Sequence, residues 1–573
     1  MHKTSVGRIK WIFIILMFAA GLVVARLFFL QIVSGDYYQV LAARQHNYST
    51  ELAPRRGSIY IQNKEGERMA VAGIKEGYDI FVNPKMLNDK KTDPDVLYGR
   101  IAEIVEVDRD YFMGRLVKKN DPYEIIVSHV DRESAERIKN LNIEGVGIVP
   151  AEWRYYPAGR AASQVVGFVG YNGDKLEGRY GIERYFDNQL SGKGGYTQGA
   201  RSAQGFLIDL GKRIFEAPEE GNDIVLTLNI DAQLFLEKAL SDAKEKWRAE
   251  SAGGLVMDPV TGKILAMAAL PDFDPNNYQD TKNINAFMNS LTEKVYEIGS
   301  VFKPLTLAAA IDRGAITPET KYHDDGFLVL NGRRIANYDG KGRGDVDMQK
   351  VLDESLNTGA VFAMQQLGKK NFYDYMVNYG IDEKTGIELP DEVVGNMSNL
   401  DTERDIEYAT AAYGQGISVT ALGAARAFSA LANGGVIMKP YIVDRIIKSG
   451  ESDDITKPEE VRRVLKPETS EVISRMLVRV VDEALAGGTA RDAHYTMAAK
   501  TGTAFIPKSG GGGYSDEMVH TFFGYAPGFD PKFLIFLYLE KPQGVRYASQ
   551  SLTATFMDTI HFLLNYYQVP PDR

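Results

Sequence analysis

The segment Tyr296-Glu-Ile-Gly-Ser-Val-Phe-Lys-Pro304 decides the fold of the larger part of this chain. Ser300 and Lys303 are three residues apart, so on a helix they share a face and the amine can reach the hydroxyl. Pro304 is tolerated only in the first turn of a helix, which predicts a helix that begins near Ser300. A lysine whose pKa is lowered by desolvation can take the proton of a serine and make it a nucleophile. Alone, however, Ser-x-x-Lys is a common pattern that a solvated helix face also explains.

Two later motifs supply further groups for the same chemistry. Ser355-Leu356-Asn357 offers a hydroxyl that can relay a proton and a carboxamide that can bind a substrate amide or hold a lysine. Lys500-Thr501-Gly502-Thr503 follows an apolar, strand-like run, and a glycine in a strand allows another backbone to come close. We therefore expect an extended peptide substrate beside this strand, with a carboxylate facing Lys500 and the two threonine hydroxyls.

A second Lys-Thr-Gly triplet, Lys384-Thr385-Gly386, shows how common such short motifs are. It follows Asp382 and Glu383 in a polar stretch with no apolar strand before it, which predicts a turn. The order of the three motifs is more specific than any one of them. Penicillin-binding proteins and class A β-lactamases carry Ser-x-x-Lys, a Ser-x-Asn-type element and Lys-Thr-Gly in this order.

The chain resembles the class B penicillin-binding proteins, from its N-terminal apolar segment to its last predicted helix. The segment around Ser300 matches the family's active-site segment almost letter for letter. One departure stands in the N-terminal part: the family usually follows Arg-Gly-x-Ile with x-Asp-Arg-Asn-Gly, whereas this chain has Tyr60-Ile61-Gln62-Asn63. The other similar segments are Tyr413-Gly-Gln-Gly-Ile-Ser-Val-Thr420, Ala427 to Gly435, Gly487-Gly-Thr-Ala490, Phe523-Gly-Tyr-Ala-Pro527, Arg56-Gly57-Ser58-Ile59, Tyr156-Pro157-Ala158-Gly159 and Gly181-Ile-Glu183-Arg-Tyr185.

This resemblance implies a serine-type D-Ala-D-Ala transpeptidase that cross-links peptidoglycan stem peptides. Ser300 would attack the penultimate D-Ala carbonyl, D-Ala would leave, and an acceptor amine would resolve the ester. Lys303 would act as the base, Ser355 would pass the proton to the leaving amine, and Asn357 would hold the substrate amide. The terminal carboxylate would be bound by Lys500, Thr501, Gly502 and Thr503. β-Lactams would acylate Ser300 as covalent inhibitors, and the chemistry needs neither a metal nor a cofactor.

The start of the chain predicts a membrane anchor. Residues Trp11 to Val33 form a run of 23 residues with one charge, Arg26. At about 1.5 Å per residue such a helix spans the roughly 30 Å hydrocarbon layer. Basic residues precede the run and Asp36 follows it, which places residues 1–10 in the cytoplasm and the catalytic domain outside the cytoplasmic (inner) membrane, in the periplasm. A cleaved signal peptide is the alternative, although the apolar run continues through Leu27 to Leu30.

The rest of the chain divides into two parts. A chain of 573 residues is too long for one core, and the polar segment Glu216 to Asn222 has the composition of a linker. We therefore predict an elongated α+β pedestal domain of the dimerisation type over residues 34–217 and an α/β transpeptidase domain over 218–573. In the second domain, strand-like runs at both ends enclose a mainly helical middle, which indicates one central antiparallel sheet covered by helices. Two of these runs flank Pro259 to Gly262 and predict a hairpin.

Composition excludes several other functions. The net charge of −10 lacks the excess of Lys and Arg that a nucleic-acid partner requires. With no cysteine, the chain cannot form disulfides, thiolate metal sites or a lipidated cysteine anchor. The seven histidines show no metal-binding spacing. No metal site is predicted.

Within the family, length and the Tyr413 to Thr420 segment most resemble the division-specific (FtsI-type) subgroup, which acts in septal wall synthesis. The resemblance then implies a membrane glycan polymerase of the FtsW/RodA type and divisome proteins as partners. An elongation-type transpeptidase is the first alternative. An anchored β-lactamase and an inactive penicillin-binding sensor or scaffold are further alternatives, and intact motifs speak against the last.

Overall fold

The computed structural model describes most of the chain beyond the predicted anchor. Within the described residues no helix is both long and apolar enough to cross a membrane. The predicted cytoplasmic tail, 1–10, and most of the predicted span, 11–33, lie outside them. The described residues are 11, 13, 16–17, 20–24, 47–52, 54–118, 120–173, 175–201, 207–208, 214–402, 404–448, 450, 452–508 and 512–573.

A five-stranded sheet organises the C-terminal part of the chain. Its strand order is β13-β12-β26-β25-β24, and every neighbouring pair is antiparallel. The sheet thus joins strands from both ends of the predicted transpeptidase domain, and β12 and β13 form the predicted hairpin. Both predictions are confirmed. The strands are β12 (Ser251–Met257), β13 (Ile264–Leu270), β24 (Ala498–Pro507), β25 (Tyr514–Ala526) and β26 (Phe533–Glu540).

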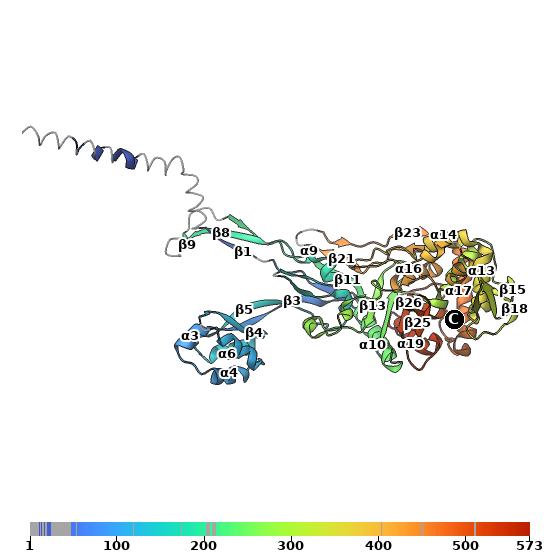
Figure 1. The fold of residues 1–573 in the computed structure, drawn as a ribbon, viewed down its shortest axis with the longest axis horizontal. Helices are drawn as coiled ribbons and strands as arrows, with labels where there is room; N and C mark the ends of the chain where they lie inside the picture. Colours follow the sequence, from blue (N-terminus) through green and yellow to red (C-terminus); the bar gives the residue numbers. More distant parts are fainter. Residues whose placement is uncertain are drawn as a thin grey trace, which may run out of the picture. The chain divides into compact units, whose positions relative to one another are not determined.

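Different helices cover the two faces of this sheet (Figure 1). Successive residues of a strand point to opposite faces. Phe522 of β25 stacks on Phe556 of α19, and Phe523 stacks on Phe428 of α16, with ring centroids 4.6 Å and 4.0 Å apart. α10 lies beside α19 on the first face. These helices are α10 (Ile230–Lys246), α16 (Ala421–Ala432) and α19 (Thr553–Tyr566).

A mainly helical region packs on the α16 side of the sheet. At its centre α11 contacts α13, α14, α16 and α17, and nearly all of its residues are buried. The elements of this region are α11 (Lys303–Asp312), α12 (Met348–Asp353), α13 (Asn357–Leu367), α14 (Lys369–Tyr379), α15 (Asp405–Ala411) and α17 (Pro467–Arg479), with small ribbons β14 (Val295–Tyr296), β15 (Lys321–Asp324), β16 (Phe327–Leu330), β17 (Arg333–Ala336), β18 (Gly344–Asp347), β19 (Val419–Thr420), β20 (Val436–Met438) and β23 (Glu460–Arg463).

A second, seven-stranded sheet contains strands from both sides of the predicted boundary at residue 217. Its order is β22-β21-β11-β2-β3-β4, with β5 paired to β3. β11 runs parallel to β2 and antiparallel to β21, so it lies between a strand of the N-terminal part and one of the C-terminal part. The strands are β2 (Ile59–Gln62), β3 (Arg68–Val82), β4 (Glu124–Val130), β5 (Val146–Tyr155), β11 (Asp223–Asn229), β21 (Val443–Ile447) and β22 (Asp454–Ile455).

The far ends of β3, β4 and β5 carry a small lobe with a core of its own. Ile80, Ile101 and Phe112 are fully buried there. Each helix of the lobe starts at an Asn or Asp whose side chain accepts a backbone N–H of the first turn, which caps the helix. The helices are α3 (Pro84–Asp89), α4 (Pro94–Ala102), α5 (Arg109–Leu116) and α6 (Arg132–Asn140).

A buried ion-pair network centres on Glu183. The Glu183 carboxylate is fully buried and binds Arg154 at 2.6 Å and Arg56 at 2.7 Å. Ile61, at the departure from the family pattern, is fully buried in the main core, so an apolar side chain fills this position. The short elements around the network are α7 (Ser163–Val166), β6 (Val169–Asn172), β7 (Lys175–Gly178), α8 (Gly181–Tyr185) and α9 (Asp187–Leu190).

A separate unit combines residues 1–55 with 191–221. Its described part is a small antiparallel sheet in which β8 pairs with β1, β9 and β10. The strands are β1 (Asn47–Leu52), β8 (Gly195–Arg201), β9 (Leu207–Ile208) and β10 (Ile214–Glu216).

Candidate active site

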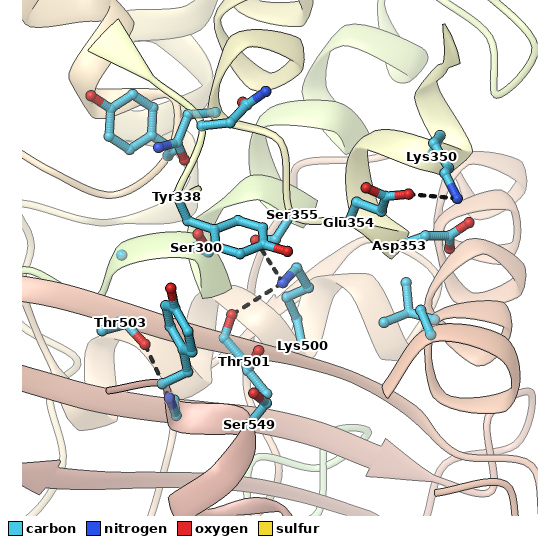
Figure 2. A pocket seen from close by; sticks show the side chains of 18 of the residues that line it. Ser300, Tyr338, Lys350, Asp353, Glu354, Ser355, Lys500, Thr501, Thr503 and Ser549 are labelled. Atoms are coloured by element: carbon cyan, nitrogen blue, oxygen red, sulfur yellow. Dashed lines mark hydrogen bonds and ion pairs between the residues drawn. The ribbon is translucent and has the colours of Figure 1, made fainter. Parts of the chain in front are cut away.

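A large cleft lies where the edge strand β24 meets the helical region, and it brings the three sequence motifs together (Figure 2). Its volume is about 1260 Å³. Of the predicted site residues, Lys303 and Gly502 are buried and do not line the cleft. Those that line it are Ser300, Ser355, Asn357, Lys500, Thr501 and Thr503.

Ser300 lies in a single turn of 3-10 helix, Gly299–Phe302, that leads directly into α11. Pro304 lies in the first turn of α11, so the predicted helix start is confirmed. The Nζ of Lys303 is 2.9 Å from the Oγ of Ser300. Lys303 is 0% exposed, and this burial, reinforced by the charge of Lys500, holds the pKa of its amine well below the usual value. A neutral amine at this distance from a serine hydroxyl can accept its proton.

Ser355 connects two lysines. Its Oγ lies 3.1 Å from the Nζ of Lys303 and 3.0 Å from the Nζ of Lys500, and its carbonyl accepts a hydrogen bond from Lys303 at 2.5 Å. The backbone of Ser355 is left-handed, with φ of 54°, a conformation that costs a non-glycine residue about 1 kcal/mol or more. The surrounding contacts must therefore hold this residue in place. A hydroxyl between two amines can pass a proton from one to the other.

Lys500 is the second buried amine of the site. It is 3% exposed, and besides Ser355 it donates to the carbonyl of Thr501 at 3.2 Å. Burial lowers the pKa of Lys500 to about 8, against a smaller opposing effect of Asp353. Below about pH 8 the amine of Lys500 is thus cationic.

The turn that carries Ser300 packs directly on β24. A Cβ at Gly502 would lie 2.4 Å from the carbonyl oxygen of Ile298, and a Cβ at Gly299 would lie 2.8 Å from that of Thr503. Gly299 also has φ of 61°, which a side chain disfavours. The backbone that approaches Gly502 is therefore the chain's own. These contacts account for both glycines without a bound peptide.

The remaining predicted residues surround this centre. Asn357 is the first residue of α13 and donates through Nδ2 to the carbonyl of Ala336 at 2.8 Å. Thr503 accepts the backbone N–H of Ala548 at its Oγ1, 3.1 Å away. Thr501 lines the cleft one residue beyond Lys500.

Two aromatic residues of the cleft were missed by the sequence analysis. Tyr338, from the loop after β17, meets Tyr547, from the segment after β26, with ring centroids 5.6 Å apart and nearly perpendicular planes. Both line the cleft, and the pair joins its two walls. The segment around Tyr413 was quoted for its resemblance, but Tyr413 and Gln415 were given no role, and both line the cleft. Single residues in loops offer no periodic signal that could have identified them.

Comparison with known families agrees with this geometry. The family model "Penicillin binding protein transpeptidase domain" matches residues 252–561, and "Penicillin-binding Protein dimerisation domain" matches residues 51–226. The chain belongs to the class B penicillin-binding proteins. As a member, it is a serine-type D-Ala-D-Ala transpeptidase of peptidoglycan synthesis and a β-lactam target.

Several proteins resemble this penicillin-binding protein over most of its length. Stage V sporulation protein D of Bacillus subtilis (strain 168) is 30% identical over 528 residues, which make up 91% of this chain and 79% of that protein. The "Peptidoglycan D,D-transpeptidase FtsI homolog" of Mesostigma viride is 27% identical over 605 residues, covering 100% of this chain and 98% of its own. Penicillin-binding protein PbpB of Mycolicibacterium smegmatis is 30% identical over 467 residues, 79% of this chain and 71% of its own.

Solved structures share the fold. Penicillin Binding Protein 2X from Streptococcus thermophilus superposes with a TM-score of 0.74 at 21% identity, covering 91% of this chain and 81% of that one. A peptidoglycan synthetase from Bifidobacterium adolescentis gives a TM-score of 0.70 at 23% identity, covering 92% and 98%. At these identities the likeness concerns the fold alone.

Proposed function

We propose that the transpeptidase forms its acyl-enzyme on Ser300, with Lys303 as the general base. One observation carries this assignment: the Lys303 amine is fully buried, has a lowered pKa and lies 2.9 Å from the Ser300 hydroxyl. A neutral amine at this distance can accept the hydroxyl proton while Oγ attacks the penultimate D-Ala carbonyl carbon. The backbone contact between Gly299 and Thr503 supports an oxyanion hole formed by the N–H groups of Ser300 and Thr503.

The same geometry suggests how the first step is completed. The tetrahedral intermediate collapses by breaking the bond to the terminal D-Ala nitrogen, which must receive a proton. We assign this transfer to Ser355, whose Oγ lies 3.1 Å from Lys303. The acceptor amine of a second stem peptide then attacks the ester, loses its proton to the same relay and releases Ser300. Asn357 holds the substrate amide.

Lys500, Thr501, Gly502 and Thr503 form the proposed subsite for the terminal carboxylate. Lys500 supplies the positive charge and the threonine hydroxyls supply neutral donors, while Gly502 lets the Ser300 turn approach the strand. The same subsite would bind the carboxylate of a β-lactam. The Mycobacterium penicillin binding protein 3 of the same fold has been solved with aztreonam and with ampicillin, which supports this expectation.

Labelling with a fluorescent penicillin tests the nucleophile. We expect wild type to form a stable covalent adduct, visible by gel and intact mass, and Ser300→Ala to form none. Ser549→Ala removes a serine hydroxyl from the same cleft and should retain labelling. Equal labelling of Ser300→Ala and wild type would end the proposal, and an adduct that turned over within seconds would favour a β-lactamase.

We further propose that this transpeptidase acts in septal wall synthesis, anchored by residues 11–33 with its catalytic domain in the periplasm. The division into a pedestal, 34–217, and a transpeptidase domain, 218–573, belongs to this proposal. So does a partner of the FtsW/RodA type together with divisome proteins. The FtsI homolog of Mesostigma viride supports the septal role, whereas the Bacillus subtilis relative is named for sporulation.

Localisation of a fluorescent fusion separates these roles. A septal band in dividing cells is the expected result. Uniform lateral signal would favour the elongation-type alternative, and signal confined to sporulating cells would favour a sporulation role. Normal wall growth in a strain whose only copy carries Ser300→Ala would instead support a sensor or scaffold.

A further inference from the structure

A short helical turn after β26 packs on the strand that carries the carboxylate subsite. This turn, α18 (Ala548–Ser551), contacts both β24 and β25. Ala548 is its first residue, so its backbone N–H has no partner within the turn. That N–H donates instead to the Oγ1 of Thr503 at 3.1 Å. The position of α18 therefore decides how the Thr503 hydroxyl is used.

The hydrogen bond from Ala548 has a consequence for the chemistry of Thr503. A hydroxyl has one hydrogen to donate and two lone pairs that can accept. With one lone pair occupied by the Ala548 N–H, the hydrogen of Thr503 is free to turn toward the cleft that the residue lines. A carboxylate is an acceptor only, so it requires a donor at this point. The backbone N–H thus sets the hydroxyl up as a donor.

A buried contact between His520 of β25 and Ser551, the last residue of α18, holds α18 against the sheet. The Oγ of Ser551, at the end of the turn, lies 2.8 Å from the Nδ1 of His520 and donates to the carbonyl of Ala548 at 3.3 Å. Which of the two atoms donates in the contact between Ser551 and His520 depends on the tautomer of the imidazole ring. Burial lowers the pKa of His520 to about 4, so the ring is neutral at neutral pH and carries one N–H.

His520 stands directly opposite Thr503. The two residues are register partners on β25 and β24, so their side chains project from the same face of the sheet. The neighbouring residue on that face of β25 is Phe522, which packs under α19 in an apolar cluster. His520 is fully buried, and burying a polar ring there is unfavourable unless it is hydrogen-bonded. Ser551 is the side-chain partner of Nδ1, a backbone hydrogen bond to Arg546 also acts on the ring, and Nε2 has no partner among the described residues.

We propose that His520 and Ser551 are positioning residues for substrate recognition: they hold α18 so that the Ala548 N–H orients the Thr503 hydroxyl toward the substrate's terminal carboxylate. The inference rests on the proposed function of Thr503 and extends it to residues that do not touch the substrate. It predicts a loss that depends on the carboxylate of the substrate, which a general loss of stability would not produce.

Ala548→Pro is a direct test, because it removes the N–H that donates to Thr503 and puts the Cδ of the proline ring in its place. Proline fits the first position of a helical turn, and the preceding Tyr547 is already extended, with φ −123° and ψ 142°, as proline requires. The measurement is the second-order rate of Ser300 acylation by benzylpenicillin and by its methyl ester, which lacks the free carboxylate. We expect the rate with benzylpenicillin to fall about fivefold to tenfold and the rate with the ester to stay within about twofold.

Two further variants test the support beneath α18. Ser551→Ala should lower the rate with benzylpenicillin severalfold and leave the ester rate unchanged. His520→Leu should do the same, and His520→Asn, whose amide can donate near the position of Nδ1, should recover part of the loss. Thr559→Val is the matched control, since Thr559 is a buried residue of α19 whose hydroxyl donates to the carbonyl of Thr555. It should leave the ratio of the two rates at the wild-type value.

The outcomes distinguish the role proposed for His520 and Ser551 from the carboxylate binding proposed for Thr503. A wild-type rate ratio near one, or an unchanged ratio in Thr503→Val, would overturn the carboxylate role of Thr503 itself. A ratio that collapses in Thr503→Val but persists in Ala548→Pro and Ser551→Ala would overturn only the role of α18 and its support. Equal losses with both acylating agents would show that these residues act through stability alone.

Discussion

Two segments of this protein share the tripeptide Lys-Thr-Gly and use it differently. Lys500-Thr501-Gly502 lies in the edge strand β24, with its lysine buried in the catalytic cleft. Lys384-Thr385-Gly386 lies in the segment after α14, with its lysine exposed and its threonine buried. The turn itself lies at residues 380–382, just before the triplet, which is neither helix nor strand. The lysine is thus the buried side chain in the strand, whereas the threonine is the buried side chain in the second copy.

Neighbouring groups cause this difference. In the second copy, the buried Glu392 accepts the N–H and the hydroxyl of Thr385 at 2.7 and 2.5 Å and the N–H of Gly386 at 3.1 Å. In the strand, Thr501 pairs with Phe522 of β25 and Gly502 with Thr521, so the threonine side chain is left for the cleft. A short motif can take part in a reaction only when its backbone groups are hydrogen-bonded to a neighbouring strand and its side chain contacts a second reactive group.

That second group is Ser355, which joins Lys500 to Lys303. Removal of Lys303 should have the largest effect on the comparison. Lys303→Met keeps the length and burial of the side chain but removes the base. We expect acylation of Ser300 by a penicillin to slow by about 100-fold to 10,000-fold, measured by stopped-flow or intact mass. Near wild-type acylation would mean that another group activates Ser300.

Parallel truncation of the two motif lysines compares the copies directly. Lys500→Ala removes one partner of a buried, charged contact with a carboxylate, a change that costs about 2–5 kcal/mol and so slows acylation at least about 30-fold. Lys384→Ala removes an exposed side chain and should change the same rate less than about twofold. Comparable losses in both variants would contradict the assignment of the cleft to β24.

The pH dependence of acylation should reveal the two buried lysines. Lys500 must be protonated to bind a carboxylate, and with its pKa lowered to about 8 the rate should fall about tenfold per pH unit above that value. Lys303 must be neutral to act as a base, so the rate should also fall as pH drops through its lowered pKa. In Lys500→Arg, which stays charged, the alkaline limb should move to higher pH. An unmoved limb would assign it to another group.

The smallest expected effect on activity belongs to the second copy. Glu392→Gln places an amide where a carboxylate oxygen now accepts backbone N–H groups, which should lower the free energy of unfolding by about 1–3 kcal/mol. Chemical denaturation would measure this loss. The acylation rate per folded molecule should stay at the wild-type value, and a clear drop would mean that this segment contributes to the cleft.

Much of the fold follows from local sequence patterns. The apolar runs on either side of Pro259 to Gly262 predicted a hairpin, and β12 and β13 form it. Pro304 predicted the start of α11. These signals depend on residues a few positions apart, which a linear reading captures. The sheet that joins β2, β11 and β21 across the predicted boundary was not foreseen, because strand pairing over such separations leaves no local trace.

The sequence predicted residues of the site but not the contacts between residues far apart in the chain. Ser300 and Lys303 meet because they are three residues apart on one helical turn. Ser355 and Lys500 meet across 145 residues, and the left-handed backbone of Ser355 has no signature in a serine. The aromatic pair Tyr338 and Tyr547 and the support of Thr503 by α18 likewise join segments far apart in the chain.

The sequence by itself determined which residues could carry acyl-transfer chemistry, because the order and spacing of hydroxyls, amines and an amide are local and specific. Tertiary structure alone decided which lysine amines lose their water and how the Thr503 hydroxyl is held. The physical reason is that reactivity here depends on burial. Desolvation lowers the pKa of Lys303 and of Lys500, and only the packing of distant segments around an amine can exclude water from it.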